Sequence, residues 1–412
     1  MALAEPTKKL VRRLVSSKQI TSSVGTTGGV GIRIRRNVLM RALLNHKLSE
    51  SRKSLATIDG AQLRDMVLQY VEANRIKSGP YGRFRYSLNG SVVLYSSLYA
   101  ALTKHLYSDL DTLSGTERKE WVNTIQGYQR EDGLFRDPAV ANEIAETADW
   151  WGWRHMTLHA VMALTALDAI AEKEFRFLSQ FRDHNFIRNW IRTRDWKNDA
   201  ANVSNEVQNF AALLQYARDF HDVTWAYDSM GVLYEELDRI QDEVTGLWGP
   251  QFNTPALLSN GVQTAYHLLL LYFYDKRPIR FTDKIVDSCL RTQNELGGFS
   301  PFLNSSACED IDSIDPLMRL SHIEMNRVRK TMQLALPWVY ANMNADGGFV
   351  FRRLEPFLYG HENMFSGINV SSMFPTWFRS LSLAYISMVL KESSLSSIGW
   401  RLLKCPGYQF QT

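Results

Sequence analysis

Four carboxylates lie close together within residues 308–316: Glu309, Asp310, Asp312 and Asp315. Negative charges at such short spacing raise one another's proton affinity, and an apolar environment raises it further. A carboxylic acid that stays protonated at neutral pH can serve as a general acid. We therefore expect Asp310, Asp312 and Asp315 to be catalytic. The alternative is that these residues only cap a helix, since acidic side chains stabilise its positive end.

A second cluster combines aromatic rings with two histidines. Trp150, Trp151 and Trp153 can line a cavity for an apolar or cationic substrate, because aromatic faces stabilise cations; the alternative is core packing. His155 and His159 have the i, i+4 spacing of metal ligands, but the sequence lacks the HExxH pattern. We expect the tryptophans and His155 to contact substrate, and we expect no metal site.

Three further candidates fall where apolar helices are expected to begin: Glu206, Gln263 and Asn369. Their side chains could hydrogen-bond a hydroxylated or sugar-like ligand. Neighbouring Ser and Asn residues could equally act as helix caps. A lining this polar is more typical of a saccharide site than of a hydrocarbon cavity. In a saccharide site, Glu206 and Asp312 could act as an acid–base pair.

An internal repeat of about 50 residues places these candidates relative to one another. A glycine followed closely by an aromatic residue recurs at Gly82, Gly133, Gly246, Gly297 and Gly347, in steps of 51, 113, 51 and 50 residues. The step of 113 is close to two periods, so a copy without glycine is expected near residue 196. Repetition of one supersecondary unit indicates a repeat architecture, and six units fit the chain from about residue 60.

Each unit contains an amphipathic helix, a glycine turn, a polar stretch and an apolar helix. A helix that is apolar all round belongs in the interior. The expected inner helices are 91–106, 153–169, 203–217, 262–274, 314–323 and 375–390. We therefore predict an all-α protein, an (α/α)6 toroid of about twelve helices whose inner helices line a central cavity. The expected domains are an N-terminal extension (1–60), the toroid (61–392) and a C-terminal tail packed on the barrel (393–412).

Composition excludes several classes of protein. Hydrophobic residues make up 45% and charged residues 22% of the chain, as in ordinary globular proteins. A net charge of +4 is too balanced to indicate nucleic-acid binding. Three cysteines without a CxxC pair exclude a disulfide framework. Without a signal peptide or an apolar run of about 20 residues, the expected location is cytoplasmic.

The N-terminal 60 residues have a different character. Residues 8–15 form a short basic amphipathic run, and residues 32–36 add positive charge. A basic amphipathic segment can contact an anionic membrane surface, which predicts peripheral membrane association. The alternative is a solvated arm that packs on the barrel.

The glycine turns resemble the repeats of the terpenoid cyclase and protein prenyltransferase superfamily, most clearly at 292–299 and 342–349 and also at 126–138 and 240–250. The resemblance covers about residues 75–390 and implies the toroid. Asp310-Ile311-Asp312 is similar to the start of the Asp-x-Asp-Asp motif of class II terpene cyclases, whose middle aspartate protonates an alkene or epoxide. By this resemblance Asp312 is the acid and Asp310 its neighbour, although the fourth position is Ser313.

The resemblance implies an isomerase that starts the cyclisation of an isoprenoid or prenylated substrate by protonation, in an aromatic-lined cavity. No cofactor is expected, and Mg²⁺ only if the substrate carries a diphosphate. By comparison with protein prenyltransferases, Asp310, Asp312 and His361 could hold zinc, but without a thiolate ligand we do not expect it. Two alternatives stay open: a carbohydrate-active toroid, and a non-enzymatic toroid that binds a peptide or a partner chain.

Overall fold

The computed structural model describes residues 28–249 and 252–411, with side chains from residue 37 onward. The chain divides into two units, Met1–His46 and Lys47–Thr412, and helix α2 (Gly28–Leu55) spans the boundary. The basic run at residues 8–15, expected to contact a membrane, lies outside the described residues. The fold and the site below belong to the second unit.

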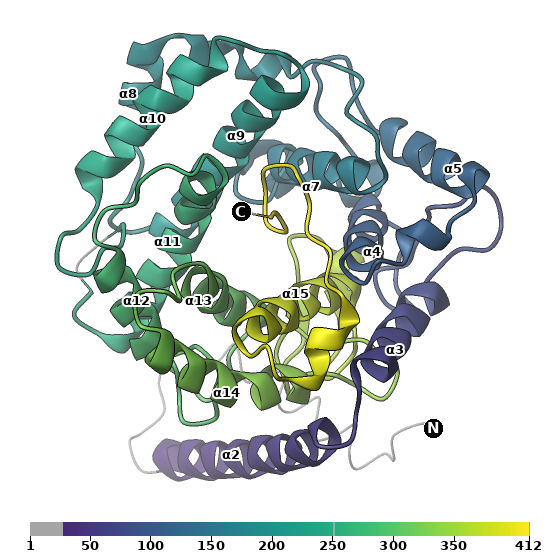
Figure 1. Ribbon diagram of the computed structural model, residues 1–412, viewed down its shortest axis with the longest axis vertical. Coiled ribbons are helices and arrows are strands. Elements are labelled where there is room, and N and C mark those ends of the chain that lie inside the picture. Colours follow the sequence, from purple (N-terminus) through teal and green to yellow (C-terminus); the bar gives the residue numbers. More distant parts are fainter. Residues whose placement is uncertain (1–27, 250–251, 412) are drawn as a thin grey trace. The chain divides into compact units, whose positions relative to one another are not determined.

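Six predominantly buried helices form the inside of the second unit. They are α4 (Leu94–Leu106), α7 (Trp153–Ala166), α9 (Ala200–Phe220), α11 (Pro255–Tyr274), α13 (Ala307–Arg319) and α15 (Met373–Val389). Each of these helices contacts the next in chain order, and α15 contacts α4, so the six close a ring (Figure 1). The predicted all-α class is confirmed.

An outer helix precedes each inner helix in the chain. The outer helices are α3 (Gly60–Ala73), α5 (Gly115–Gln126), α8 (His184–Arg192), α10 (Ala226–Ile240), α12 (Thr282–Arg291) and α14 (Met325–Ala341). The short helix α6 (Glu143–Thr147) lies between α5 and α7, and the paired strands β1 (Phe357–Leu358) and β2 (Phe365–Ser366) lie between α14 and α15. The unit without a glycine, expected near residue 196, supplies α8 and α9.

The repeated glycines are required by the backbone. Gly82, Gly133, Gly246, Gly297 and Gly347 all have positive φ, between 71° and 100°. An added Cβ at Gly347 would lie 2.0 Å from the carbonyl oxygen of Met66 in α3. The last repeat therefore packs closely against the first at this point. Only glycine tolerates both this φ and this approach of two backbones.

We expect Gly347→Ala to lower the free energy of unfolding by more than about 2 kcal/mol, because the energetic cost of a strained φ adds to that of a backbone clash. The matched control is Gly231→Ala in the interior of α10, where an added Cβ meets nothing within 4 Å. There alanine should stabilise the protein by about 0.5–1 kcal/mol. Equilibrium unfolding in urea measures both values. An unchanged midpoint for Gly347→Ala would contradict the packing of the last repeat on α3.

The inner helix expected at 314–323 begins earlier than predicted. Ser306 accepts a hydrogen bond from the Glu309 amide and the Glu309 side chain accepts one from the Ser306 amide, a capping box that starts α13 at Ala307. Ser306, and not an aspartate, is therefore the cap, and Asp312 and Asp315 lie further inside the helix. Glu309 and Asp310 stand in the first turn, where acidic side chains stabilise the positive helix end. Pro316 likewise lies within α13 rather than at its start.

Candidate functional site

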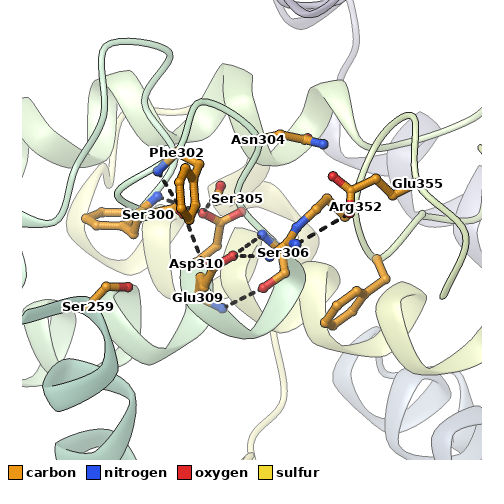
Figure 2. A network of polar contacts seen from close by, with 12 residues as sticks. Ser259, Ser300, Phe302, Asn304, Ser305, Ser306, Glu309, Asp310, Arg352 and Glu355 are labelled. Atoms are coloured by element: carbon orange, nitrogen blue, oxygen red, sulfur yellow. Dashed lines mark hydrogen bonds and ion pairs between the residues drawn. The ribbon is translucent and has the colours of Figure 1, made fainter. Parts of the chain in front are cut away.

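Asp310 is a fully paired, buried carboxylate. It accepts hydrogen bonds from the Ser305 hydroxyl (2.6 Å), the Phe299 amide (2.9 Å) and the Trp338 indole (3.1 Å). Arg379 of α15 lies 2.8 Å away, and neither side chain of this ion pair is exposed (0% each). Figure 2 shows the polar network around Asp310, Ser305 and Ser306. Every donor around Asp310 comes from the protein itself, which is typical of a structural role.

The repeat explains why a polar side chain stands at position 310. In the second repeat the amide of Phe135 donates to Thr157 of α7, and in the last repeat the amide of Phe349 donates to Thr376 of α15, each over 3.0 Å. Asp310 accepts from the corresponding Phe299 amide. All three inner-helix side chains therefore satisfy the buried N–H of a glycine turn.

Glu309 and Asp315 are paired as well. Arg352 donates to Glu309 over 2.7 Å, and Ser300 donates to the second oxygen of Glu309 over 2.9 Å (Figure 2). Asp315 forms a buried ion pair with Arg319, one turn further along α13. Each of these carboxylates thus has its own arginine.

Asp312 differs from these neighbours. Within the described residues its side chain has neither a hydrogen bond nor an ion pair, and it is only 3% exposed. Burial raises the pKa of Asp312 well above its usual range, and the carboxylates of Glu309, Asp310 and Asp315 raise it further. The protonated form of Asp312 is therefore favoured more than that of an exposed aspartate, and its carboxyl group has no hydrogen-bond partner among the described residues.

The groups near Asp312 are also short of partners. The rings of Tyr266 and Tyr408 lie 6.3 Å apart between centroids, and burial, with a contribution from the Asp312 carboxyl group, raises the pKa of both tyrosines. Neither amide atom of Gln208 has a hydrogen-bond partner, and the Tyr266 hydroxyl has none. We call Gln208, Tyr266, Asp312 and Tyr408 the central cluster. Buried polar groups are normally satisfied, so these atoms indicate a place for water or for a polar group of a ligand.

Aromatic rings of three inner helices pack beside this cluster. Tyr99 stacks on Tyr95 of the same helix (5.7 Å between centroids) and on Trp377 of α15 (5.4 Å). His159 of α7 lies 5.2 Å from the ring of Tyr408 and meets Trp377 edge-on at 5.6 Å. This aromatic wall presents faces that could stabilise a cation.

The structure groups only some of the residues expected to contact substrate, namely Trp151 and His155. Trp151 and His155 are buried and lie in one aromatic group with buried Tyr95 and half-buried Tyr359, and the indole N–H of Trp151 has no partner. The indole N–H of Trp153 is also buried without a partner, and Trp150 is half-buried without a ring contact among the described residues.

The hydrogen bonds of His155 define its protonation state. Tyr95 donates its hydroxyl to the Trp151 carbonyl (2.9 Å), so Nδ1 of His155 is the donor toward Tyr95 (2.7 Å). The Nε2 atom then accepts from the Tyr359 hydroxyl at 3.2 Å. Burial lowers the pKa of His155 well below its usual value, with a contribution from His159, so the ring is neutral.

The polar side chains expected where the apolar helices begin are engaged by nearby residues of the protein. Glu206 pairs with Arg194 at 3.1 Å. Gln263 donates to the carbonyl of Ser259, one turn earlier in α11. Asn369 is exposed at a positive φ and accepts from the amide of Leu354, as turn residues do.

The described part of the chain holds no group of three or more His, Cys, Asp or Glu residues placed to bind a metal ion. Nor does any helix in it combine the length and apolarity needed to cross a membrane. A pocket of about 900 Å³, lined by Arg218, Tyr234, Lys276 and Lys404 among others, contains none of the expected site residues.

No protein-family model matches the chain, and no curated protein matches it either. The resemblance to terpenoid cyclases and protein prenyltransferases therefore rests on the turn segments and on Asp310-Ile311-Asp312. Sequence reasoning missed Gln208, Tyr266 and Tyr408, because apolar helices and a short tail carry such residues without a motif.

Proposed function

We propose that the protein is an enzyme that protonates an isoprenoid or prenylated substrate with Asp312 and converts it to a cyclic isomer. The observation that carries the proposal is the contrast within one helix: Glu309, Asp310 and Asp315 have arginine partners. Asp312 is buried and unpaired among the described residues, and burial raises its pKa. A buried carboxylic acid without a partner costs stability, and perturbed groups of this kind cluster at functional sites.

The chemistry balances without a cofactor. The proton of Asp312 adds to one carbon of a double bond and leaves a carboxylate. The resulting cation forms a carbon–carbon bond to a second double bond while the aromatic wall stabilises its charge. Loss of a proton to water then gives a product isomeric with the substrate, and Asp312 is reprotonated from solvent.

Two alternatives receive less support from the contacts. A saccharide enzyme needs a free partner for Asp312, but Glu206 is paired with Arg194. A non-enzymatic toroid that binds a peptide or a partner chain would have its acidic cluster paired with arginines. Glu309, Asp310 and Asp315 are paired in this way, but Asp312 is not among the described residues. Because isoprenoids partition into membranes, association of the basic N-terminal run with a membrane surface belongs to the same proposal.

The test is turnover of a panel of polyprenols, polyprenyl diphosphates and prenylated aromatics, with products identified by mass spectrometry. In D₂O we expect one non-exchangeable deuterium in the product, because the first step transfers a solvent-derived proton to carbon. Asp312→Asn should lower the rate by about 10²–10⁴-fold, whereas Asp283→Asn at the exposed start of α12 should not. Product without deuterium, or full activity of Asp312→Asn, would refute the proposal.

A further inference from the structure

Residues 403–411 form a loop that is held by its own backbone bonds. The amide of Leu403 donates to the Gln409 carbonyl (2.7 Å), and the amide of Gln411 donates back to the Leu403 carbonyl (2.8 Å). At Gly407 φ is 134°, and an added Cβ would lie 2.4 Å from the sulfur of Met162 in α7. We call this segment the C-terminal loop; Figure 1 shows it in yellow inside the ring of inner helices.

The base of the C-terminal loop lies where the inner helices end. Arg319, the last residue of α13, donates to the Phe410 carbonyl over 3.1 Å, and its guanidinium lies 4.2 Å from the centre of the Phe410 ring. Tyr274, the last residue of α11, meets the same ring edge-on at 5.5 Å. The Gln409 side chain donates to the Leu102 carbonyl of α4 over 3.2 Å.

Tyr408 extends from the loop into the interior of the ring, beyond the ends of the inner helices. Its ring contacts His159 of α7 (5.2 Å), Tyr266 of α11 (6.3 Å) and Trp377 of α15 (6.0 Å). Its hydroxyl lies 3.5 Å from Oδ1 of Asn205 in α9. With the contacts of its base to α4 and α13, the C-terminal loop therefore touches all six inner helices.

We infer that the C-terminal loop closes the ring at the end where the inner helices end, and that Tyr408 forms a wall of the site at Asp312. Cys308, in the first turn of α13, is partly exposed. Tyr408 and Asp312 are each only 3% exposed, and both belong to the interior of the ring of inner helices. The inference concerns access, so it stands or falls independently of the proposed reaction.

Thiol labelling of the folded protein tests this closure. In Asp312→Cys, two thiols lie one turn apart on α13: the introduced one at position 312, and native Cys308 in the first turn of the helix. A bulky maleimide is added in buffer without denaturant, and tandem mass spectrometry gives the labelling rate of each position. We expect the added change Tyr408→Ala to raise the rate at position 312 about tenfold or more, with the rate at Cys308 unchanged. Tyr408→Phe, which keeps the ring, should leave both rates as they were.

Gly347→Ala in the same Asp312→Cys background separates closure from general loss of stability. It destabilises the fold at the turn between α14 and α15, and it should not raise labelling at position 312 relative to Cys308. Equal rates at position 312 with and without Tyr408→Ala would overturn the inference. A parallel rise at both positions, matched by Gly347→Ala, would also overturn it, because opening would then be global.

Discussion

Arg379→Met should lower the free energy of unfolding by about 3–5 kcal/mol, because it leaves the buried Asp310 carboxylate without a counter-ion. Arg379 also donates to the carbonyls of Val350 (2.9 Å) and Phe351 (2.8 Å), so these acceptors lose their partner as well. Methionine keeps most of the apolar volume of the arginine side chain, which limits the effect to charge and hydrogen bonding. Equilibrium unfolding in urea at neutral pH measures the loss.

Two controls locate the origin of this effect. Arg401→Met removes an ion pair with Asp111 whose side chains are 46% and 62% exposed, and it should cost less than about 1 kcal/mol. Adding Asp310→Asn to Arg379→Met should recover part of the loss, since the buried negative charge is removed too. A loss below about 1 kcal/mol for Arg379→Met would show that Asp310 is neutral or hydrated in the folded protein.

The repeat was the part of the fold that the sequence could predict. Glycine at a positive φ and an aromatic residue after it are local requirements of one turn, so they recur at a fixed spacing and reveal the order of the helices. The boundary of α13 was predicted wrongly because the inner helix was identified by apolar residues, whereas its first two turns are acidic. The capping pair Ser306 and Glu309 was the available local signal.

The candidate site was less predictable because its contacts are long-range. Arg379 lies 69 residues from Asp310, in an apolar helix whose sequence contains no reason to pair it with an aspartate. The C-terminal loop has neither a repeat nor a helical period, yet it supplies Tyr408. The sequence could therefore identify a cluster of carboxylates, but only the packing of α13 against its neighbours separates Asp312 from the others.

An unpaired buried acid is costly, and this cost depends on pH. Because the pKa of Asp312 is raised in the folded state, the folded protein holds this proton more tightly than the unfolded chain does. As pH rises above about 4, the usual pKa of an aspartate, the unfolded chain ionises first and gains free energy that the folded protein does not. The contribution of Asp312 to stability therefore falls from about pH 4 up to its folded pKa, by about 1.4 kcal/mol for each pH unit between the unfolded and the folded pKa.

Asp312→Asn should accordingly be more stable than the unmodified protein at pH 8 and equally stable near pH 4, while the proposed activity is lost. Asparagine has almost the same shape and cannot ionise, and Asp312 has no hydrogen bond among the described residues to lose. Urea unfolding at several pH values between 4 and 8 gives the difference, and Asp283→Asn on the surface should stay within about 0.5 kcal/mol throughout.

The pairing of these two effects distinguishes a catalytic acid from a structural one. Substitution of a structural aspartate should destabilise the protein, as expected for Asp310. Substitution of an acid that is kept for reactivity should instead stabilise the protein and abolish its turnover. If Asp312→Asn is less stable than the unmodified protein at pH 8, then in the protein in solution the Asp312 carboxylate is ionised and has a stabilising partner. The protonated acid and the reaction proposed for it would then both be wrong.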